Sequence, residues 1–409
     1  MPSGKFEDFK ENKEEAKKFG EKEAKNWELT DKQKKSVAEY VSSRTIQEAA
    51  KSQLFLPKSH FEEQDKVAYE RLENLAKGVD KAKLNLGVVS YKNVTEKDIG
   101  FNNDLASGNA LDKVEFKKFQ KQFEGEIVKL DNFYDSKITS ENSNPNNRVL
   151  LKVKVPSTKG TTFKPHTGIY MDEKSEPHLL VDHSYGFLVE GVSKIVIKGK
   201  ECVKVDGMLK PNIDFANNDS EAKSYGTKTS ADWRESLSPN EVSVFEGYLK
   251  QDYKEINPYL RDPNSKPDSK LDEKIETMTN ALERKEIPEG LTVYRWAGAK
   301  EFGYEIGKVP PLEKFESDWL GQTREEAAYM STSLYNSDPQ FQSARPIVLR
   351  LYLPKGTHAG YLSAAPFTGY ESELELLLDK GYKYKITRVK EMTIKGKKKY
   401  LVDATLLLK

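Results

Sequence analysis

The feature that most constrains this chain is an internal repeat with an offset of about 200 residues. The segment that begins at Tyr91 matches the segment that begins at Tyr294 without a gap, and Gly100 falls opposite Gly303. Three more matches follow the same order: Trp27 with Trp233, residues 149–156 with 347–354, and Val205 with Val402. Similarity at one offset across the whole chain predicts two tandem copies of one fold.

Each copy begins with helical sequence and ends with β-rich sequence. Residues 6–50 combine Lys, Glu and Ala with apolar residues spaced for one helical face, and residues 219–260 repeat this arrangement. Ser238, followed by a proline and then by a glutamate at the third position, has the pattern of a helix N-terminus. Helices followed by strands predict an α+β fold in each copy. The predicted domains are residues 1–210 and 216–409, joined by a linker at 211–219.

Composition narrows the classes of function. At 409 residues the chain can hold two cores, and its 66 basic residues nearly balance 65 acidic ones, so charge does not indicate a nucleic-acid partner. No apolar run approaches the ~18 residues of a membrane span. The single cysteine, Cys202, and five histidines without paired spacing predict neither a disulfide nor a metal site. No apolar secretory segment follows Met1, so we expect a cytosolic chain or a mature form without its leader.

An acidic stretch near the C-terminus, residues 370–378, is the first candidate site. Its residues alternate with the period of a strand, which predicts that Glu371, Glu373 and Glu375 share one face. The apolar run of residues 376–378 predicts a strand buried on both faces, so the acids should border a cleft. The alternative is a half-exposed strand with a solvated acidic face.

The two copies differ in their polar residues while keeping the same apolar pattern. Arg295 is matched by Lys92, and Glu375 by His178, with Pro177 disturbing the alternation of the first copy. Such divergence predicts one copy that does chemistry and one that only binds. The alternative is that Lys92 and His178 serve a second, different chemistry.

Three motifs in the second copy carry a family resemblance. Arg295, the run Ser331-Thr332-Ser333 and the run Glu373-Leu374-Glu375, in this order, resemble the Arg/Ser-Thr-Ser/Glu-x-Glu group of mono-ADP-ribosyltransferase toxins. The whole chain resembles the enzymatic components of clostridial and bacillary binary toxins, with most similarity to the vegetative insecticidal toxin enzyme. The resemblance implies two tandem ADP-ribosyltransferase-like folds, each with N-terminal helices and a mixed or antiparallel two-sheet β core.

The resemblance also implies roles for the motif residues. Glu375 would stabilise the positive charge that develops on ribose when the nicotinamide bond of NAD breaks, because a fixed carboxylate needs no reorganisation. Ser331 would hold Glu375 by a hydrogen bond. Glu373, on the same face about 7 Å away, would receive a target arginine and help to remove its proton. In the family, glutamate at this position accompanies arginine acceptors.

The resemblance places the remaining site residues by motif matching. The predicted cofactor-binding residues besides Ser331 and Glu375 are Arg295, Trp296, Arg350, Tyr248, Tyr253, Asn257 and Phe341. Tyr370 is predicted to contact the protein substrate. Two residues depart from the iota-type pattern: Trp296 stands in place of a second arginine, and Lys300 in place of glutamine.

The implied protein is a secreted toxin subunit that transfers ADP-ribose from NAD to an arginine of host actin in the host cytosol. Its N-terminal domain would dock onto a separate pore-forming component that delivers it, and the subunit by itself would be a monomer. Three alternatives remain open. They are an inverting glycoside hydrolase using the paired carboxylates, a non-catalytic binding module, and a transferase for an arginine on another protein.

Overall fold

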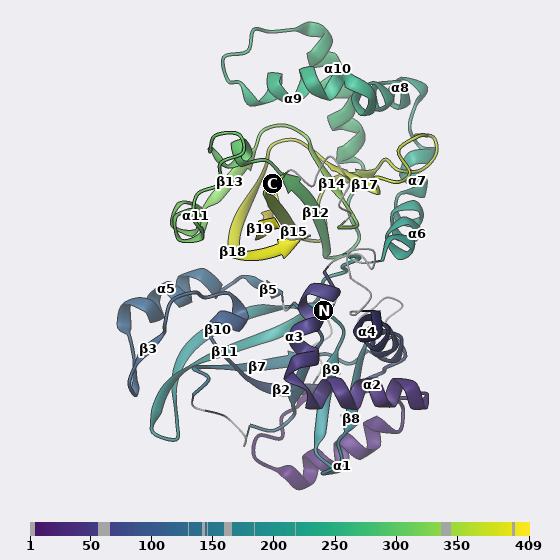
Figure 1. Cartoon of the computed structure of the whole chain (residues 1–409). Helices are drawn as coiled ribbons and strands as arrows, with labels where there is room; N and C mark the ends of the chain where they lie inside the picture. The colour runs from purple at the N-terminus through teal and green to yellow at the C-terminus, as the bar shows by residue number, and fades with distance from the viewer. Residues whose placement is uncertain are drawn as a thin grey trace. The chain divides into compact units, whose positions relative to one another are not determined.

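The computed structural model divides the chain into two compact units, Met1–Pro211 and Asn212–Lys409 (Figure 1). These are called the N-terminal and C-terminal units below. The structure describes residues 5–55, 66–129, 131–140, 144, 146–158, 166–183, 185–216, 218–336, 345–394 and 397–409.

The N-terminal unit starts with helices and continues with strands. Its α-helices are α1 (Lys13–Ala24), α2 (Asp31–Ser42), α3 (Arg44–Gln53), α4 (Lys66–Val79) and α5 (Lys113–Phe123). Its strands are β1 (Phe6–Glu7), β2 (Gly87–Val94), β3 (Ala106–Ser107), β4 (Ala110–Leu111), β5 (Ile127–Lys129), β6 (Tyr134–Lys137), β7 (Val149–Val155), β8 (Thr167–Met171), β9 (Pro177–Val181), β10 (Tyr185–Ile197) and β11 (Lys200–Pro211).

The C-terminal unit repeats this arrangement, and in Figure 1 its helices α8 to α10 gather at one end of the strands. Its α-helices are α6 (Asp219–Thr229), α7 (Ala231–Glu235), α8 (Pro239–Gly247), α9 (Tyr253–Arg261), α10 (Ser269–Glu283) and α11 (Leu312–Trp319). Its strands are β12 (Leu291–Ala297), β13 (Thr323–Glu326), β14 (Met330–Ser333), β15 (Ile347–Leu353), β16 (Ala359–Tyr361), β17 (Glu375–Leu378), β18 (Tyr382–Ile394) and β19 (Lys397–Leu407).

Strand order confirms the repeat. The described strands run β5-β10-β11-β7-β2-β6-β9-β8 in the first unit and β13-β18-β19-β15-β12-β14-β17-β16 in the second. Within the second, β15 and β19 are parallel and the other neighbours antiparallel. Its two halves are joined by one register pair, Tyr294 on β12 with Ser333 on β14. The α+β fold with two tandem copies, each with N-terminal helices and a mixed β core, is therefore confirmed.

Local sequence explains where the helices begin. Thr30 and Ser238 each accept a hydrogen bond from the backbone at the third helical residue, whose Gln33 or Glu241 side chain accepts from the cap backbone in return. Pro239 occupies the first helical position of α8, where no intrahelical donor is needed. The predicted N-terminus of this helix is confirmed.

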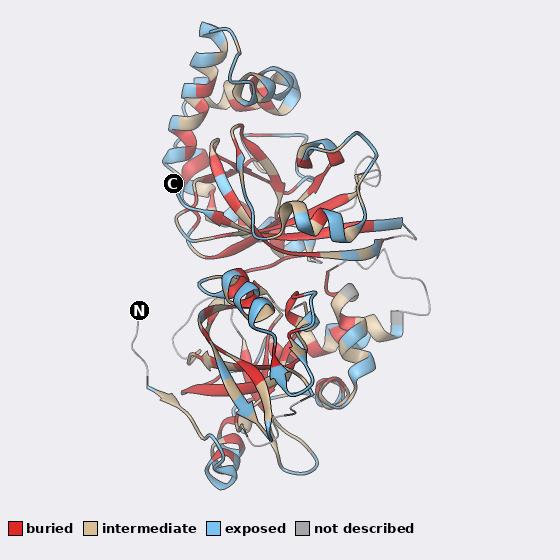
Figure 2. Cartoon of the chain, turned by 90° about the vertical axis from the view of Figure 1, so that its left-hand side faces the viewer, coloured by how far each residue is buried: buried red, intermediate tan, exposed pale blue. Residues whose placement is uncertain are grey.

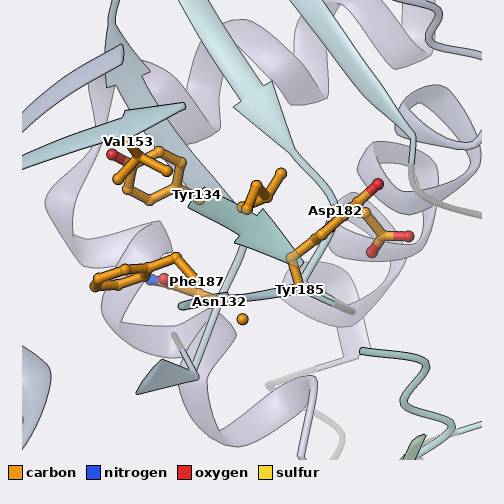
Figure 3. Close-up of a pocket in the computed structure, with 8 residues that line it drawn as sticks. Asn132, Tyr134, Val153, Asp182, Tyr185 and Phe187 are labelled. Carbon is orange, nitrogen blue, oxygen red and sulfur yellow. The ribbon is translucent and has the colours of Figure 1, made fainter. Parts of the chain in front are cut away.

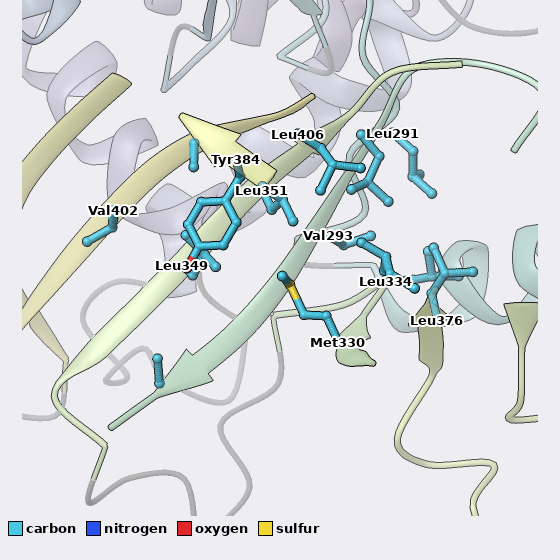
Figure 4. Packing of buried hydrophobic residues seen from close by; sticks show 14 of the residues in the cluster. Leu291, Val293, Met330, Leu334, Leu349, Leu351, Leu376, Tyr384, Val402 and Leu406 are labelled. Carbon is cyan, nitrogen blue, oxygen red and sulfur yellow. The ribbon is translucent and has the colours of Figure 1, made fainter. Parts of the chain in front are cut away.

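Each unit has its own apolar core between its strands and its helices. In Figure 2 the buried residues follow the strands of both units. In the C-terminal unit, Leu349 and Leu351 of β15 pack with Met330 of β14 and Leu376 of β17 (Figure 4). Leu377 points to the other face, where it packs with Tyr248 and other residues of the helical layer. The prediction that residues 376–378 are buried on both faces is confirmed.

The predicted linker is wrong, because Asn212, Ile213 and Asp214 are part of the C-terminal unit. Ile213 forms a bridge with Leu291 and belongs to the apolar core. The buried side chains of Asn212 and Asp214 accept hydrogen bonds from Thr292 (2.7 Å) and from the Tyr294 hydroxyl (2.6 Å). Polar residues that suggested a solvated connection are instead partners of strand β12.

A tryptophan packs against a strand glycine in both units. A Cβ on Gly168 would lie 2.6 Å from the Trp27 ring, and a Cβ on Gly360 would clash with the ring of Trp233. Neither glycine has a left-handed φ, so the close approach of the ring, and not backbone conformation, requires glycine here.

We expect Gly360→Ala to lower the free energy of unfolding by about 1–3 kcal/mol, because the added methyl displaces a buried indole. Urea denaturation followed by circular dichroism measures this. Gly298→Ala is the control, since a Cβ there meets nothing nearer than 3.9 Å. Equal stability of the two variants would contradict the packing described.

Candidate active site

Three neighbouring strands bring the predicted triad together. Arg295 lies on β12, Ser331 on β14 and Glu375 at the start of β17, and these strands are adjacent in the sheet. The three residues are far apart in the chain, so only the pairing of their strands brings them together.

Arg295 lies where β12 and β14 separate. Its guanidinium donates to the main-chain oxygen of Ser331 (3.0 Å) and, through two nitrogens, to Glu301 (2.8 and 3.1 Å). Burial opposes the positive charge, but the Glu301 carboxylate outweighs it and raises the pKa of Arg295. Arg295 is therefore a permanent cation held in a fixed orientation.

Glu375 is a buried carboxyl group whose side chain sits beside Ser331. It is 5% exposed, and burial raises its pKa from 4.5 to about 7. A hydrogen bond from Ser331 and the charge of Arg295 oppose this shift, whereas the Glu373 carboxylate adds to it. Near neutral pH the group can exist in either protonation state, which is typical of catalytic carboxylates.

The backbone around the two glutamates corrects one prediction. Residues 371–374 form a turn and not a strand, and Leu374 has a left-handed φ of +49°. The turn is held by Ser333, whose hydroxyl donates to the Glu373 carbonyl (2.9 Å), and by the Leu334 amide, which donates to the Leu374 carbonyl (3.0 Å). Glu371, Glu373 and Glu375 therefore do not share a strand face. The tight turn overrides their alternation.

Glu373 is exposed, and partial desolvation by its surroundings raises its pKa. It influences the ionisation of Glu375, so the two carboxylates remain neighbours. Glu373 is thus accessible to solvent at the rim of the site, whereas Glu375 is buried inside it, so the two carboxylates can have different roles.

Two residues that were not predicted hold the main chain at Glu375. The buried hydroxyl of Ser363 accepts a hydrogen bond from the Glu375 amide (2.8 Å). Arg234 of α7, also buried, donates to the Ala365 carbonyl (2.8 Å) and so fixes the loop that leads to Glu373. Neither residue belongs to a recognisable motif.

The predicted aromatic helix lies beside the triad. Tyr248 starts a π-helical turn, Tyr248–Asp252, and its hydroxyl accepts a hydrogen bond from Asn257 of α9 (3.0 Å). Burial raises the pKa of Tyr248, and the nearby charge of Glu375 adds to the shift, which places Tyr248 close to that carboxylate. The Tyr253 ring lies 6.3 Å from the Tyr248 ring and is 41% exposed. Tyr253 therefore offers an open aromatic surface at the site.

Arg350 does not belong to the site. It is 5% exposed, and its guanidinium donates to both carboxylate oxygens of Asp403 (2.7 and 3.0 Å), which also pairs with Arg388. On β15 it is paired with Tyr294, the neighbour of Arg295, so it faces the other side of the sheet. The predicted phosphate contact is therefore not supported by the position of Arg350, because this guanidinium is already engaged in a buried ionic cluster.

Arg345 is the second arginine near the triad. Its guanidinium donates to the Trp296 carbonyl (2.5 Å). Burial and the charge of Arg295 lower the pKa of Arg345, while Glu301 and Tyr253 act in the opposite direction. These influences place Arg345 beside Arg295, so the site has two cations within one neighbourhood.

The remaining predicted residues fall in different places. Trp296 follows Arg295 on β12, so its side chain points to the opposite face; it is 3% exposed and packs under Lys399. The predicted cofactor contact of Trp296 is therefore not supported by its position. Tyr370 is half-buried in the loop before Glu373. Phe341 lies outside the residues that the structure describes.

Among the residues that the structure describes, no group of three or more His, Cys, Asp or Glu side chains could hold a metal ion, and no helix is long and apolar enough to span a membrane. The site instead combines two carboxylates, two guanidinium groups and a tyrosine surface. This combination can bind an anionic dinucleotide and stabilise a developing cation.

Comparison with known proteins names the family. The sequence profile of the ADP-ribosyltransferase exoenzyme family matches residues 16–211 and again residues 222–409. The chain belongs to the ADP-ribosyltransferase exoenzyme family. It is an ADP-ribosyltransferase, and enzymes of this kind use NAD as the ADP-ribose donor.

Solved structures are similar over the whole chain. An ADP-ribosylating toxin, BECa, of a binary enterotoxin of C. perfringens, solved with NADH, has a TM-score of 0.81 at 28% identity and covers 99% of both chains. The enzymatic component C2-I of the C2-toxin from Clostridium botulinum has a TM-score of 0.76 at 25% identity and covers 98% of this chain and 99% of its own.

Curated relatives match one part of the chain. The epidermal cell differentiation inhibitor of Staphylococcus aureus is 29% identical over 191 residues, which is 42% of this chain and 75% of the relative. The mono-ADP-ribosyltransferase C3 of a Clostridium botulinum D phage is 28% identical over 208 residues, 47% of this chain and 78% of the relative.

Sequence reasoning missed Glu301, Arg345 and Ser363. Glu301 had a usable signal, because it is the third residue of the short helix Ala299–Phe302 and accepts from the amide of the cap residue Gly298 (2.9 Å). Arg345 and Ser363 had none, since each approaches the site from a distant loop. Their contribution is visible only in three dimensions.

We expect Glu375→Gln to stabilise the protein above pH 7 by up to about 3 kcal/mol, and not below pH 4.5. Between pH 4.5 and about 7 the folded wild type keeps a proton that the unfolded chain releases, so its stability falls as the pH rises. Denaturation curves at several pH values measure the difference.

Glu371→Gln is the matched control. Hydrogen bonds to backbone amides lower the pKa of this exposed loop carboxylate, so its removal should not stabilise the protein at high pH. Parallel pH curves for wild type and Glu375→Gln would show that the burial of Glu375 does not oppose its ionisation.

Proposed function

We propose that the C-terminal unit transfers ADP-ribose from NAD to an arginine of a host protein, with actin as the predicted acceptor. One observation carries this proposal. A buried carboxyl group with a raised pKa lies beside a serine and a fixed arginine, with a second glutamate at its rim, in only one of two copies of the fold. The matching position in the other copy is a histidine.

The buried carboxylate suits cleavage of the nicotinamide–ribose bond. When this bond breaks, its electron pair leaves with nicotinamide and positive charge develops on the ribose. Ionised Glu375 would stabilise that charge in a site where water does not compete. Ser331 would keep the carboxylate in one rotamer, and the cation of Arg295 favours the ionised form.

The rim carboxylate suits an arginine acceptor. Glu373 is exposed on a tight turn, so an incoming guanidinium can reach it and form a bidentate pair. One guanidinium nitrogen would then attack the ribose carbon and lose its proton as the new bond forms. The raised pKa of Glu373 improves it as a proton acceptor for this step. Tyr370, in the same loop, would contact the acceptor protein.

The two cations suit the pyrophosphate of NAD. We assign this contact to Arg295 and Arg345, which lie together beside Glu301. A planar guanidinium matches phosphate oxygens, and Glu301 keeps Arg295 in place. Tyr248, Tyr253 and Asn257 line the same side of the site and would hold the rest of the dinucleotide.

The N-terminal unit would serve delivery and not catalysis. One solved structure similar over the whole chain is from a binary enterotoxin, and another is the enzymatic component of the C2-toxin, which supports a toxin subunit that works with a separate component. We propose that the N-terminal unit docks onto an oligomeric pore-forming partner, and that the secreted monomer acts in the host cytosol. We also propose that, among such toxin subunits, this protein is most similar to the vegetative insecticidal toxin enzyme.

We expect the protein to label purified actin on arginine when incubated with radiolabelled NAD. Glu375→Gln should lose at least about 100-fold in both NAD hydrolysis and transfer, because the developing charge is no longer stabilised. Glu373→Gln should lose far more transfer than hydrolysis, because only transfer needs the acceptor to be oriented. Peptide mass spectrometry identifies the modified residue.

Glu371→Gln is the control for this assay. It removes an exposed carboxylate of the same loop that has no role in the proposed site, so both activities should be kept. Normal transfer by Glu375→Gln and Glu373→Gln would overturn the assignment of the site. Modification of a different protein in cell lysate, with actin unlabelled, would overturn the choice of actin and keep the arginine transferase. Absence of NAD turnover would favour a binding module.

We expect Arg345→Met to raise KM for NAD at least about tenfold with unchanged thermal stability, because a phosphate contact is lost. Arg350→Met should instead lower thermal stability strongly, because Asp403 would lose a buried partner. Steady-state kinetics and melting curves of both variants separate the two. A large KM effect confined to Arg350→Met would restore Arg350 as the phosphate ligand.

A further inference from the structure

The N-terminal unit has a cavity of about 320 Å³ on strands β2 and β6, lined by Lys92, Asn93, Asp135, Lys137, Asn147 and His178 among others. This volume is in the range of small-molecule sites. A second cavity in the same unit, beside Tyr134, Asp182 and Tyr185 (Figure 3), has about 10 Å³. That space holds no more than a water molecule, so only the larger cavity is a candidate site.

The larger cavity occupies the position that the active site has in the C-terminal unit. The strand register shows this directly. Tyr91 pairs with Lys137 and Lys137 with His178, just as Tyr294 pairs with Ser333 and Ser333 with Glu375. Lys92 therefore stands at the position of Arg295, and Asp135 at the position of Ser331.

The substitutions remove the chemistry of NAD cleavage. His178 replaces the catalytic carboxylate, and its two ring nitrogens contact Asp135 (3.1 Å) and Asp172 (3.2 Å). Lys137 lies 2.7 Å from His178 and pairs with Glu176 (2.8 Å). With both nitrogens engaged, the imidazole is not available as a base or nucleophile. The cavity can bind, but these groups do not form a catalytic carboxylate site.

Lys92 contributes a positive charge to this cavity. Among the described residues it forms no ion pair within 4 Å, and its ammonium lies 5.4 Å from the Tyr134 ring. Burial lowers the pKa of Lys92, although Asp135 and Asp98 partly offset the shift. The charge of Lys92 is only partly compensated by these carboxylates, so an anion that enters the cavity can pair with it.

The neighbouring polar groups add hydrogen-bond donors. The hydroxyl groups of Thr139 and Ser140 and the amide of Asn147 also line the cavity. Amides and hydroxyls match sugar hydroxyls, and an ammonium group binds phosphate as a point charge.

We propose that this cavity binds a small sugar phosphate, a pentose phosphate or mononucleotide, without cleaving it. Lys92 would hold the phosphate oxygens, while Asp135 and Asn147 would bind sugar hydroxyls. The N-terminal unit would then have a ligand site at the position of the dinucleotide site of the C-terminal unit, with a lysine in place of the arginine that binds phosphate. This binding does not depend on the function proposed for the C-terminal unit.

Calorimetric titration of the full chain with AMP, ribose 5-phosphate and inorganic phosphate tests the proposal. We expect a sugar phosphate to bind, Lys92→Met to weaken it at least tenfold, and Lys92→Arg to retain it within a few-fold. Lys154→Met, which removes a lysine paired with Glu190 outside the cavity, is the control and should bind as wild type. Melting curves should show Lys92→Met folded and at least as stable as wild type.

Arg345→Met separates the two units, because it removes a cation of the C-terminal site. Sugar-phosphate binding that survives Arg345→Met and fails in Lys92→Met supports the proposal. Binding that fails in Arg345→Met and survives Lys92→Met would assign the ligand to the C-terminal unit and overturn it. Absence of binding to wild type by all three probes would overturn it as well.

Discussion

The burial of one carboxyl group, Glu375, is the constraint on which the C-terminal unit depends. A carboxyl group in a core strand is costly unless neighbours stabilise its charge. Here the Ser331 hydroxyl and the Arg295 cation supply that support, and Glu301 in turn holds Arg295. The ionisation of the buried acid therefore depends on Arg295, and the position of Arg295 depends on Glu301. Removing any member changes the ionisation of the others.

The fold permits this arrangement because the sheet is nearly divided in two. Only Tyr294 and Ser333 join β12 to β14 in register, so the strands separate beside Arg295 and admit its side chain between them. The same single junction, Tyr91 with Lys137, occurs in the N-terminal unit. A site at this point is thus a property of the fold, and side-chain identity determines what each copy does with it.

The two copies carry different polar residues at this junction. The two units have the same strand order, and apolar residues of these strands form the core in each unit. In contrast, the positions of Arg295, Ser331 and Glu375 carry Lys92, Asp135 and His178 in the first copy. Core positions are constrained by packing in both units, whereas packing does not fix the identity of the polar residues at the junction.

The sequence by itself determined the duplication, the α+β class, the helix start at Ser238 and the strands that carry Arg295 and Ser331. These follow from periodicity, capping chemistry and internal similarity, which are local or directly comparable along the chain. Tertiary structure alone decided that residues 371–374 form a turn, that Arg350 is buried against Asp403, and that Arg345 and Ser363 lie beside the triad. An arginine on a strand looks the same in sequence whichever face it occupies. Only the partners brought by distant strands and loops distinguish a ligand from a structural ion pair.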